Sequence, residues 1–324
     1  MNLHLLEPKG ITYVNDDVPN RGRLVGYHCK PAVRLLLSAL THDIKSLPRK
    51  DRQSIMDADE CRYTIGFEIE KTRFKRGAIK RYPLFCGFER DGSCGVEAVT
   101  NVLPLLPQSE WRTKVFSLFY DAEKIIDSSH SPTDFSCGGH ITVGIKGMRG
   151  EEILQRLRPF VGIVYALWRK RLKNGYCSSN LNLRTHDEYF SDEQRCFNGY
   201  GSRYKAVLPK GNCLEFRLVN RVDSVEQMIR RYELFYTLVR ESGKRGMTIQ
   251  KMWKKCLPIV SMMYKSDFDT QDELDSKLSE LEKLTYGFQD LINHWHEWYA
   301  DSSSTEEVFE NMDDDVRFFV TNDY

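Results

Sequence analysis

The stretch GFEIE (66–70) decides how the rest of this 324-residue sequence is interpreted. Side chains alternate between the two faces of a β-strand, so Phe67 and Ile69 point to one face while Glu68 and Glu70 point to the other. The two carboxylates then lie about 7 Å apart on one surface. A solvated polar face of an edge strand would give the same pattern, so this stretch alone predicts a strand and no specific chemistry.

Two further segments repeat this design, GGHITVG (138–144) and LEFRL (214–218), and DGSCGVE (91–97) adds a turn at Asp91-Gly92 followed by a strand that carries Glu97. Where apolar and polar residues alternate in them, the polar side chains share the face opposite the core. The glycine pair before His140 also lets another backbone or a ligand come close. Together the four segments predict one antiparallel sheet whose polar face carries Glu68, Glu70, Asp91, Glu97, His140, Glu215 and Arg217.

A polar face with this many carboxylates predicts a cation site. Carboxylates are costly on a dry protein face unless cations neutralise them. Carboxylate oxygens with a single imidazole suit Mg²⁺ or Mn²⁺, and Mg²⁺ in protein sites is usually shared with substrate phosphates. The residues alone therefore indicate a metal-dependent enzyme that handles phosphate groups.

The hydrophobic periodicity around these segments favours an α+β fold with an antiparallel sheet. The predicted strands cover 63–70, 84–90, 94–101, 134–144, 203–208 and 213–219. The predicted helices cover 31–47, 108–127, 151–173 with a bend at Pro159, 224–241, 250–264 and 270–299. The last 20 or so residues are expected to be a mobile tail or an edge strand. We expect an N-terminal extension with one helix (1–60), a catalytic domain (61–245) and a helical C-terminal region with an acidic tail (246–324).

The composition is that of a soluble globular protein. Hydrophobic residues make up 41% and charged residues 29%, which excludes disordered and low-complexity classes. The nine cysteines are scattered without a CxxC pair and are expected to be reduced thiols. Without a signal-peptide pattern or a stretch of 18 apolar residues, we expect a cytoplasmic protein that does not enter a membrane.

The charge is unevenly distributed, although the net charge is only +1. Residues 61–250 carry 31 basic and 21 acidic side chains, whereas residues 251–324 carry 7 and 17. The basic part suits an anionic nucleotide and an acidic substrate, and the acidic end suits docking on that part or on a partner. One basic run is expected to form either a loop over ATP or an acidic substrate, or a solvated hairpin loop; it comprises Lys71, Arg73, Lys75, Arg76, Lys80 and Arg81.

The order of the motifs resembles that of a known family. GFEIE comes first, followed by DGS with a Glu six residues after the Asp, then GGHITVG, Arg-Tyr (203–204) and LEFR. This order, over roughly residues 61–240, is similar to the amidoligase family of carboxylate-amine ligases, which share the catalytic fold of glutamine synthetase and glutamate cysteine ligase. The resemblance implies an antiparallel sheet funnel whose polar face binds two or three Mg²⁺ ions, with Mn²⁺ as a substitute, and ATP.

The resemblance also implies roles for individual residues. The metal ligands would be Glu68, Glu70, Asp91, Glu97, His140 and Glu215. Arg217 would contact the transferred phosphoryl group, and Arg203 would bind nucleotide phosphate or a substrate carboxylate. The nucleotide-binding set would be His140, Arg217, Arg203 and Lys205. The implied reaction joins a small-molecule or peptide carboxylate to an amine through an acyl phosphate. Such genes are common in bacteria and their viruses, so a viral copy would act in the host cytoplasm.

Two other interpretations remain open. The same carboxylates could serve a metal-dependent phosphohydrolase or nuclease, although the near-neutral net charge argues against a dedicated nucleic-acid binder. The chain also departs from the family pattern: Thr142 stands where a second His is common, and KAVLP (205–209) follows the Arg-Tyr pair where an Asn is common. A catalytically degenerate relative that binds partners is therefore the other alternative.

Overall fold

The computed structural model describes residues 62–79, 82–91, 94–127, 137–173, 206–301, 310 and 313–321. These residues form two compact units. The first contains the described residues up to Lys146 together with Asn220–Tyr232, and the second contains those of Gly147–Val219 and Glu233–Tyr324. The predicted N-terminal extension (1–60), with its helix at 31–47, lies outside the described residues.

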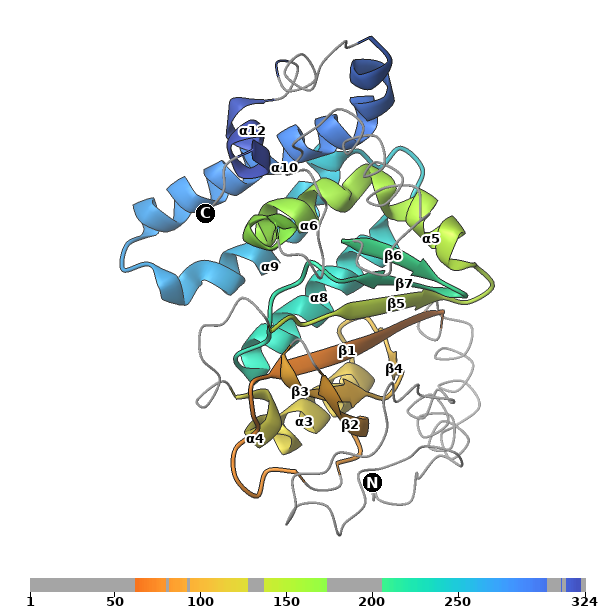
Figure 1. Cartoon of the computed structure of the whole chain (residues 1–324), viewed down its shortest axis with the longest axis vertical. Coiled ribbons are helices and arrows are strands. Elements are labelled where there is room, and N and C mark those ends of the chain that lie inside the picture. The colour runs from red at the N-terminus through yellow and green to blue at the C-terminus, as the bar shows by residue number, and fades with distance from the viewer. Residues whose placement is uncertain are drawn as a thin grey trace. The chain divides into compact units, whose positions relative to one another are not determined.

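The first unit is built on an antiparallel sheet with β1 (Tyr63–Lys71) between two neighbours (Figure 1). On one side β1 pairs with β3 (Gly95–Thr100) and, nearer its start, with the short β4 (Leu103–Pro104). On the other side it pairs with β5 (Ile141–Ile145). The hairpin partner of β3 is β2 (Phe85–Asp91). Mixed helices and an antiparallel sheet confirm the predicted α+β class.

Helices α3 (Glu110–Asp121) and α4 (Glu123–Ile126) belong to the same unit. The ring of Phe119 on α3 meets that of Phe67 on β1 edge to face, with centroids 6.0 Å apart, so α3 covers the apolar face of β1. A single helix was expected over 108–127, but it is interrupted at Ala122, which ends α3 and precedes α4. Phe116 packs against Tyr232 of α8 (Val225–Glu241), with ring centroids 5.2 Å apart.

In the second unit, the predicted long helix at 151–173 is divided by its proline. It consists of α5 (Gly150–Leu157), a 3-10 turn at Arg158–Phe160, α6 (Val161–Leu167) and a second 3-10 segment at Arg169–Lys173. Pro159 has no N–H to donate to the preceding turn, so the α-helix ends before it. All residues of α6 are buried, as expected for a helix in the middle of a core.

The other described elements of the second unit include a β-hairpin and the helices α9 (Ile249–Tyr264), α10 (Gln271–Asp301) and α12 (Asp314–Thr321). Strands β6 (Val207–Lys210) and β7 (Cys213–Phe216) are antiparallel. Helix α10 packs against α6 closely enough that a Cβ at Gly162 would lie 2.5 Å from the carbonyl oxygen of Thr285. No helix in the described part of the chain is long and apolar enough to cross a membrane.

The expectation of a mobile tail or an edge strand at the C-terminus was wrong for residues 314–321, which form helix α12 (Asp314–Thr321). Asp313 caps the start of this helix, because its Oδ1 accepts hydrogen bonds from the backbone N–H groups of Asp315 and Val316. Val316 is fully buried, and its Cγ2 lies 2.6 Å from where a Cβ at Gly287 of α10 would be. The cap from Asp313 and the buried contact of Val316 therefore stabilise a helix in this acidic segment.

Candidate metal centre

Three carboxylates of the first unit converge on one face of the sheet. Glu68 and Glu70 lie on β1, opposite the buried Phe67 and Ile69, as the alternation predicts. Glu97 on β3 stands directly across from Glu70 in the strand register. One carboxylate oxygen from each of Glu68, Glu70 and Glu97 lies within 4.8 Å of the other two. The three side chains are thus close enough to share one cation.

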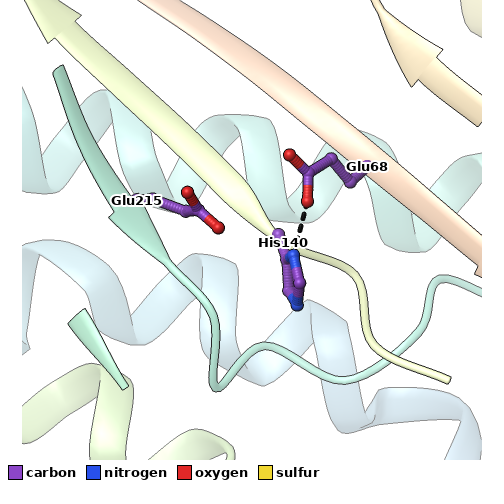
Figure 2. A group of neighbouring side chains, drawn as sticks. All are labelled: Glu68, His140 and Glu215. Carbon is purple, nitrogen blue, oxygen red and sulfur yellow. Dashed lines mark hydrogen bonds and ion pairs between the residues drawn. The ribbon is translucent and has the colours of Figure 1, made fainter. Parts of the chain in front are cut away.

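His140 directly precedes β5, so it reaches this cluster from the edge of β1 that does not pair with β3. The backbone N–H of Glu68 donates to the carbonyl oxygen of His140 at 3.0 Å, which places the histidine beside that strand. The Nδ1 of His140 forms a hydrogen bond with the Glu68 carboxylate (Figure 2). Its Nε2 lies 3.3 Å from Oε1 of Glu70. Both ring nitrogens therefore face carboxylates.

This arrangement concentrates buried negative charge. Glu70 and His140 are each only 5% exposed, so solvent screens the charge of Glu70 weakly. Like charges directly opposite each other destabilise a β-sheet, and Glu70 and Glu97 are such a pair. The three carboxylates that meet here form an oxygen donor set that suits a hard divalent ion such as Mg²⁺ or Mn²⁺, and the imidazole of His140 lies beside two of them.

The glycine pair before His140 supports the cluster through its backbone. The N–H of Gly138 donates a hydrogen bond to Oε2 of Glu70. Gly138 also forms a β-bridge with Asn220. A Cβ at Gly139 would lie 2.3 Å from the carbonyl oxygen of Asn220, so only glycine fits there. The predicted close approach of another backbone at this pair is confirmed.

Two of the predicted site residues belong to the second unit, on β7 and directly after it. Glu215 is fully buried, and its Oε1 accepts a hydrogen bond from Nη1 of Arg217 at 2.6 Å. The ammonium of Lys210, on β6, forms an ion pair with the other oxygen of Glu215. This buried carboxylate is therefore paired with cations from β6 and from the residue just after β7.

The structure says less about the other predicted site residues. Asp91 is the last residue of β2, paired with Gly95, and its side chain lies outside the described set. Arg203 and Lys205, together with the segment 174–202, also lie outside it. The roles that the sequence indicates for these residues therefore stay predictions.

The basic run that starts at Lys71 is not uniformly exposed to solvent. Lys71 is the last residue of β1 and is only 1% exposed. Burial lowers its pKa to about 8, although the nearby Asp223 carboxylate acts in the opposite direction. Lys75 forms a 2.5 Å ion pair with Asp127, while Arg73 and Arg76 are exposed. The sequence interpretation missed that Lys71 belongs to the strand.

Comparison with known proteins adds no relative to this picture. Neither a protein-family model nor a curated protein matches the chain.

Proposed function

We propose that this chain is an ATP- and Mg²⁺-dependent ligase that joins a carboxylate to an amine through an acyl phosphate. The observation that carries the proposal is the convergence of Glu68, Glu70 and Glu97 with His140 on one face of an antiparallel sheet. That donor set suits the metal chemistry of phosphoryl transfer, and the order of the motifs resembles that of the amidoligase family.

Each residue would have a specific role in this reaction. Mg²⁺ would be held by Glu68, Glu70, Glu97 and His140, and when bound it neutralises charge on the phosphate oxygens of ATP. The substrate carboxylate attacks the γ-phosphorus and ADP leaves. The amine then attacks the acyl carbon, phosphate leaves, and the amine loses a proton to give the amide. Water has to be kept from the acyl phosphate, since hydrolysis would waste ATP.

The resemblance assigns the contact with the transferred phosphoryl group to Arg217. Arg217 would bind the transferred group through its guanidinium, whose fork of donors matches phosphate oxygens. Glu215, which accepts from Arg217, would orient that guanidinium or take part in holding Mg²⁺ as the resemblance implies. Lysine cannot reproduce the fork, so we propose that Arg217→Lys loses most of the activity.

Metal binding is the first test, because it precedes any knowledge of the substrates. We expect Glu97→Gln to weaken the binding of Mn²⁺, measured by the loss of the free Mn²⁺ electron paramagnetic resonance signal, by more than about 10-fold. The amide keeps the shape of the side chain and removes its charge. The matched control is Glu123→Gln, which removes an exposed carboxylate at the start of α4 in the same unit. Equal affinities of the two variants and the wild type would contradict the proposed site.

Product analysis then distinguishes a ligase from the metal-dependent hydrolase that the same cluster could serve. Purified protein is incubated with Mg·ATP and libraries of acids and amines, with Glu97→Gln as the blank. A ligase releases ADP and phosphate only when an acid and an amine are both present. Cleavage of a phosphate ester or of nucleic acid without ATP would support the hydrolase and exclude the ligase.

A further inference from the structure

A short segment, 220–223, contacts the backbone that precedes His140 in the candidate metal centre. Asn220 forms the β-bridge with Gly138, whose N–H holds the Glu70 carboxylate. The carbonyl oxygen of Asn220 also occupies the space that a side chain at position 139 would need. The position of segment 220–223 therefore determines where Gly138, Gly139 and the adjoining His140 lie.

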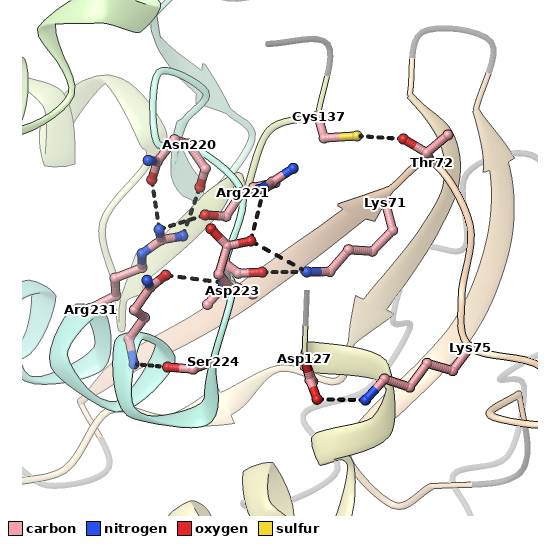
Figure 3. A network of polar contacts seen from close by, with 12 residues as sticks. Lys71, Thr72, Lys75, Asp127, Cys137, Asn220, Arg221, Asp223, Ser224 and Arg231 are labelled. Carbon is pink, nitrogen blue, oxygen red and sulfur yellow. Dashed lines mark hydrogen bonds and ion pairs between the residues drawn. The ribbon is translucent and has the colours of Figure 1, made fainter. Parts of the chain in front are cut away.

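Arg231 of α8 fixes the start of this segment. Its Nη1 donates to the carbonyl oxygen of Asn220 at 2.7 Å, and its Nη2 donates to Oδ1 of Asn220 at 2.6 Å and to the carbonyl oxygen of Arg221 at 2.8 Å (Figure 3). Three bonds from one planar guanidinium define both the position and the orientation of the acceptors. Arg231 is only 4% exposed, so water competes little for these bonds.

Lys71 fixes the end of the segment. Its Nζ donates to the carbonyl oxygen of Val222 at 2.6 Å and lies 3.8 Å from Oδ1 of Asp223. Arg221 forms a second ion pair with the same oxygen of Asp223, at 2.8 Å (Figure 3). Lys71 directly follows Glu70 on β1. The strand that carries Glu68 and Glu70 is therefore bonded to the segment that determines the place of His140.

We propose that Arg231 and Lys71 are positioning residues for the candidate metal centre. They hold segment 220–223, the segment holds the backbone at 138–139, and that backbone sets the direction of the Glu70 carboxylate and the place of His140. The inference rests on the proposed function in one respect, since it requires that the centre binds a metal ion. Groups that orient metal ligands in this way are typically worth roughly 10- to 100-fold in metal affinity.

The second unit contains a matched control for Arg231. Arg156 of α5 donates from Nη2 to the carbonyl oxygen of Val239 at 2.9 Å and from Nε to the Oγ of Ser242 at 3.0 Å. Its guanidinium also lies against a glycine, because a Cβ at Gly243 would be 2.3 Å from Nη2. Both arginines thus use side chain to backbone bonds to hold a segment, but the segment that Arg156 holds, 239–243, contains none of the candidate metal ligands.

The test measures Mn²⁺ affinity of the full-length protein by electron paramagnetic resonance, with thermal unfolding recorded for each variant. We expect Arg231→Met to weaken Mn²⁺ binding by about 10-fold or more, and Arg156→Met to leave it within about twofold of wild type even if its melting temperature falls. Arg231→Lys keeps the charge but cannot make three bonds in the same plane, so we expect an intermediate affinity. That variant also serves if Arg231→Met does not fold.

The possible results separate the two proposals. Absence of Mn²⁺ binding by the wild type would overturn the proposed function and this inference with it. Wild-type binding together with unchanged affinity in the Arg231 variants would overturn only the positioning role. An equal loss of affinity in Arg231→Met and Arg156→Met would also overturn it, because general destabilisation would then explain the effect.

Discussion

Cys256 shows how burial controls the chemistry of a single side chain. It is fully buried on α9, and burial raises its pKa to about 12, with the Glu241 carboxylate adding to the shift. At pH 8 only about one thiol in 10⁴ is then ionised, and the thiolate is the reactive form. The partly exposed Cys213 is also shifted upwards by burial, but Lys210 opposes the shift.

We therefore expect iodoacetamide at pH 8 to modify Cys213 in the native protein well before Cys256. Peptide mass spectrometry after timed quenching measures the two rates. Unfolding in urea provides the control, because both thiols should then react at similar rates. Native-state labelling of Cys256 as fast as that of Cys213 would show that α9 opens readily.

At the same scale, the sequence predicted where Glu68 and Glu70 lie better than it predicted which residues support them. Strict alternation around Phe67 and Ile69 was enough to place Glu68 and Glu70 on one face. The roles of Lys71 and Arg231 were missed because their partners are backbone carbonyls at positions 220–222. Every residue has a carbonyl, so such a bond leaves no signature in the sequence.

Among the helices, α3 has a capping residue, Ser109, whose contribution to stability can be measured by one substitution. The Oγ of Ser109 accepts a hydrogen bond from the N–H of Arg112 at 3.2 Å, satisfying one of the free donors at the helix start. We expect Ser109→Ala to lower the free energy of unfolding by about 1 kcal/mol, as measured by urea denaturation. Ser117→Ala, the same substitution at an exposed position of α3, should change it by less than about 0.5 kcal/mol. Equal effects would mean that the cap does not stabilise the helix.

The bounds of helices and strands were predictable from the sequence where the apolar residues follow one clear period. Alternation located β1, whose observed end differs from the prediction by one residue, and the apolar periodicity located α8 and α9 equally well. The interruption at Ala122 was not predictable, because alanine is a good helix former and its residue type does not mark the end of a helix. The start of β6 at Val207 likewise depends on its pairing with Phe216 of β7 rather than on its own sequence.

At the scale of the whole molecule, some acidic side chains from the C-terminal end of the chain pair with basic side chains from its middle, within the second unit. Glu280 of α10, from the acidic end of the chain, accepts a 2.5 Å hydrogen bond from Arg169, which belongs to the basic part. Lys277, also on α10, pairs with the other oxygen of Glu280. Half-exposed pairs like these contribute little stability individually, but they fit the expectation that acidic and basic parts of the chain dock on each other.

Hydrogen exchange with and without Mn²⁺ tests the site across the whole chain. A metal that binds only the folded state stabilises the segments that hold its ligands. We expect slower exchange in β1, β3 and residues 138–141, and little change in α9 and α10, with Glu97→Gln as the variant in which the effect disappears. Protection that extends to β7 would support the predicted participation of Glu215, whereas protection confined to the second unit would place the metal elsewhere and contradict the proposed centre.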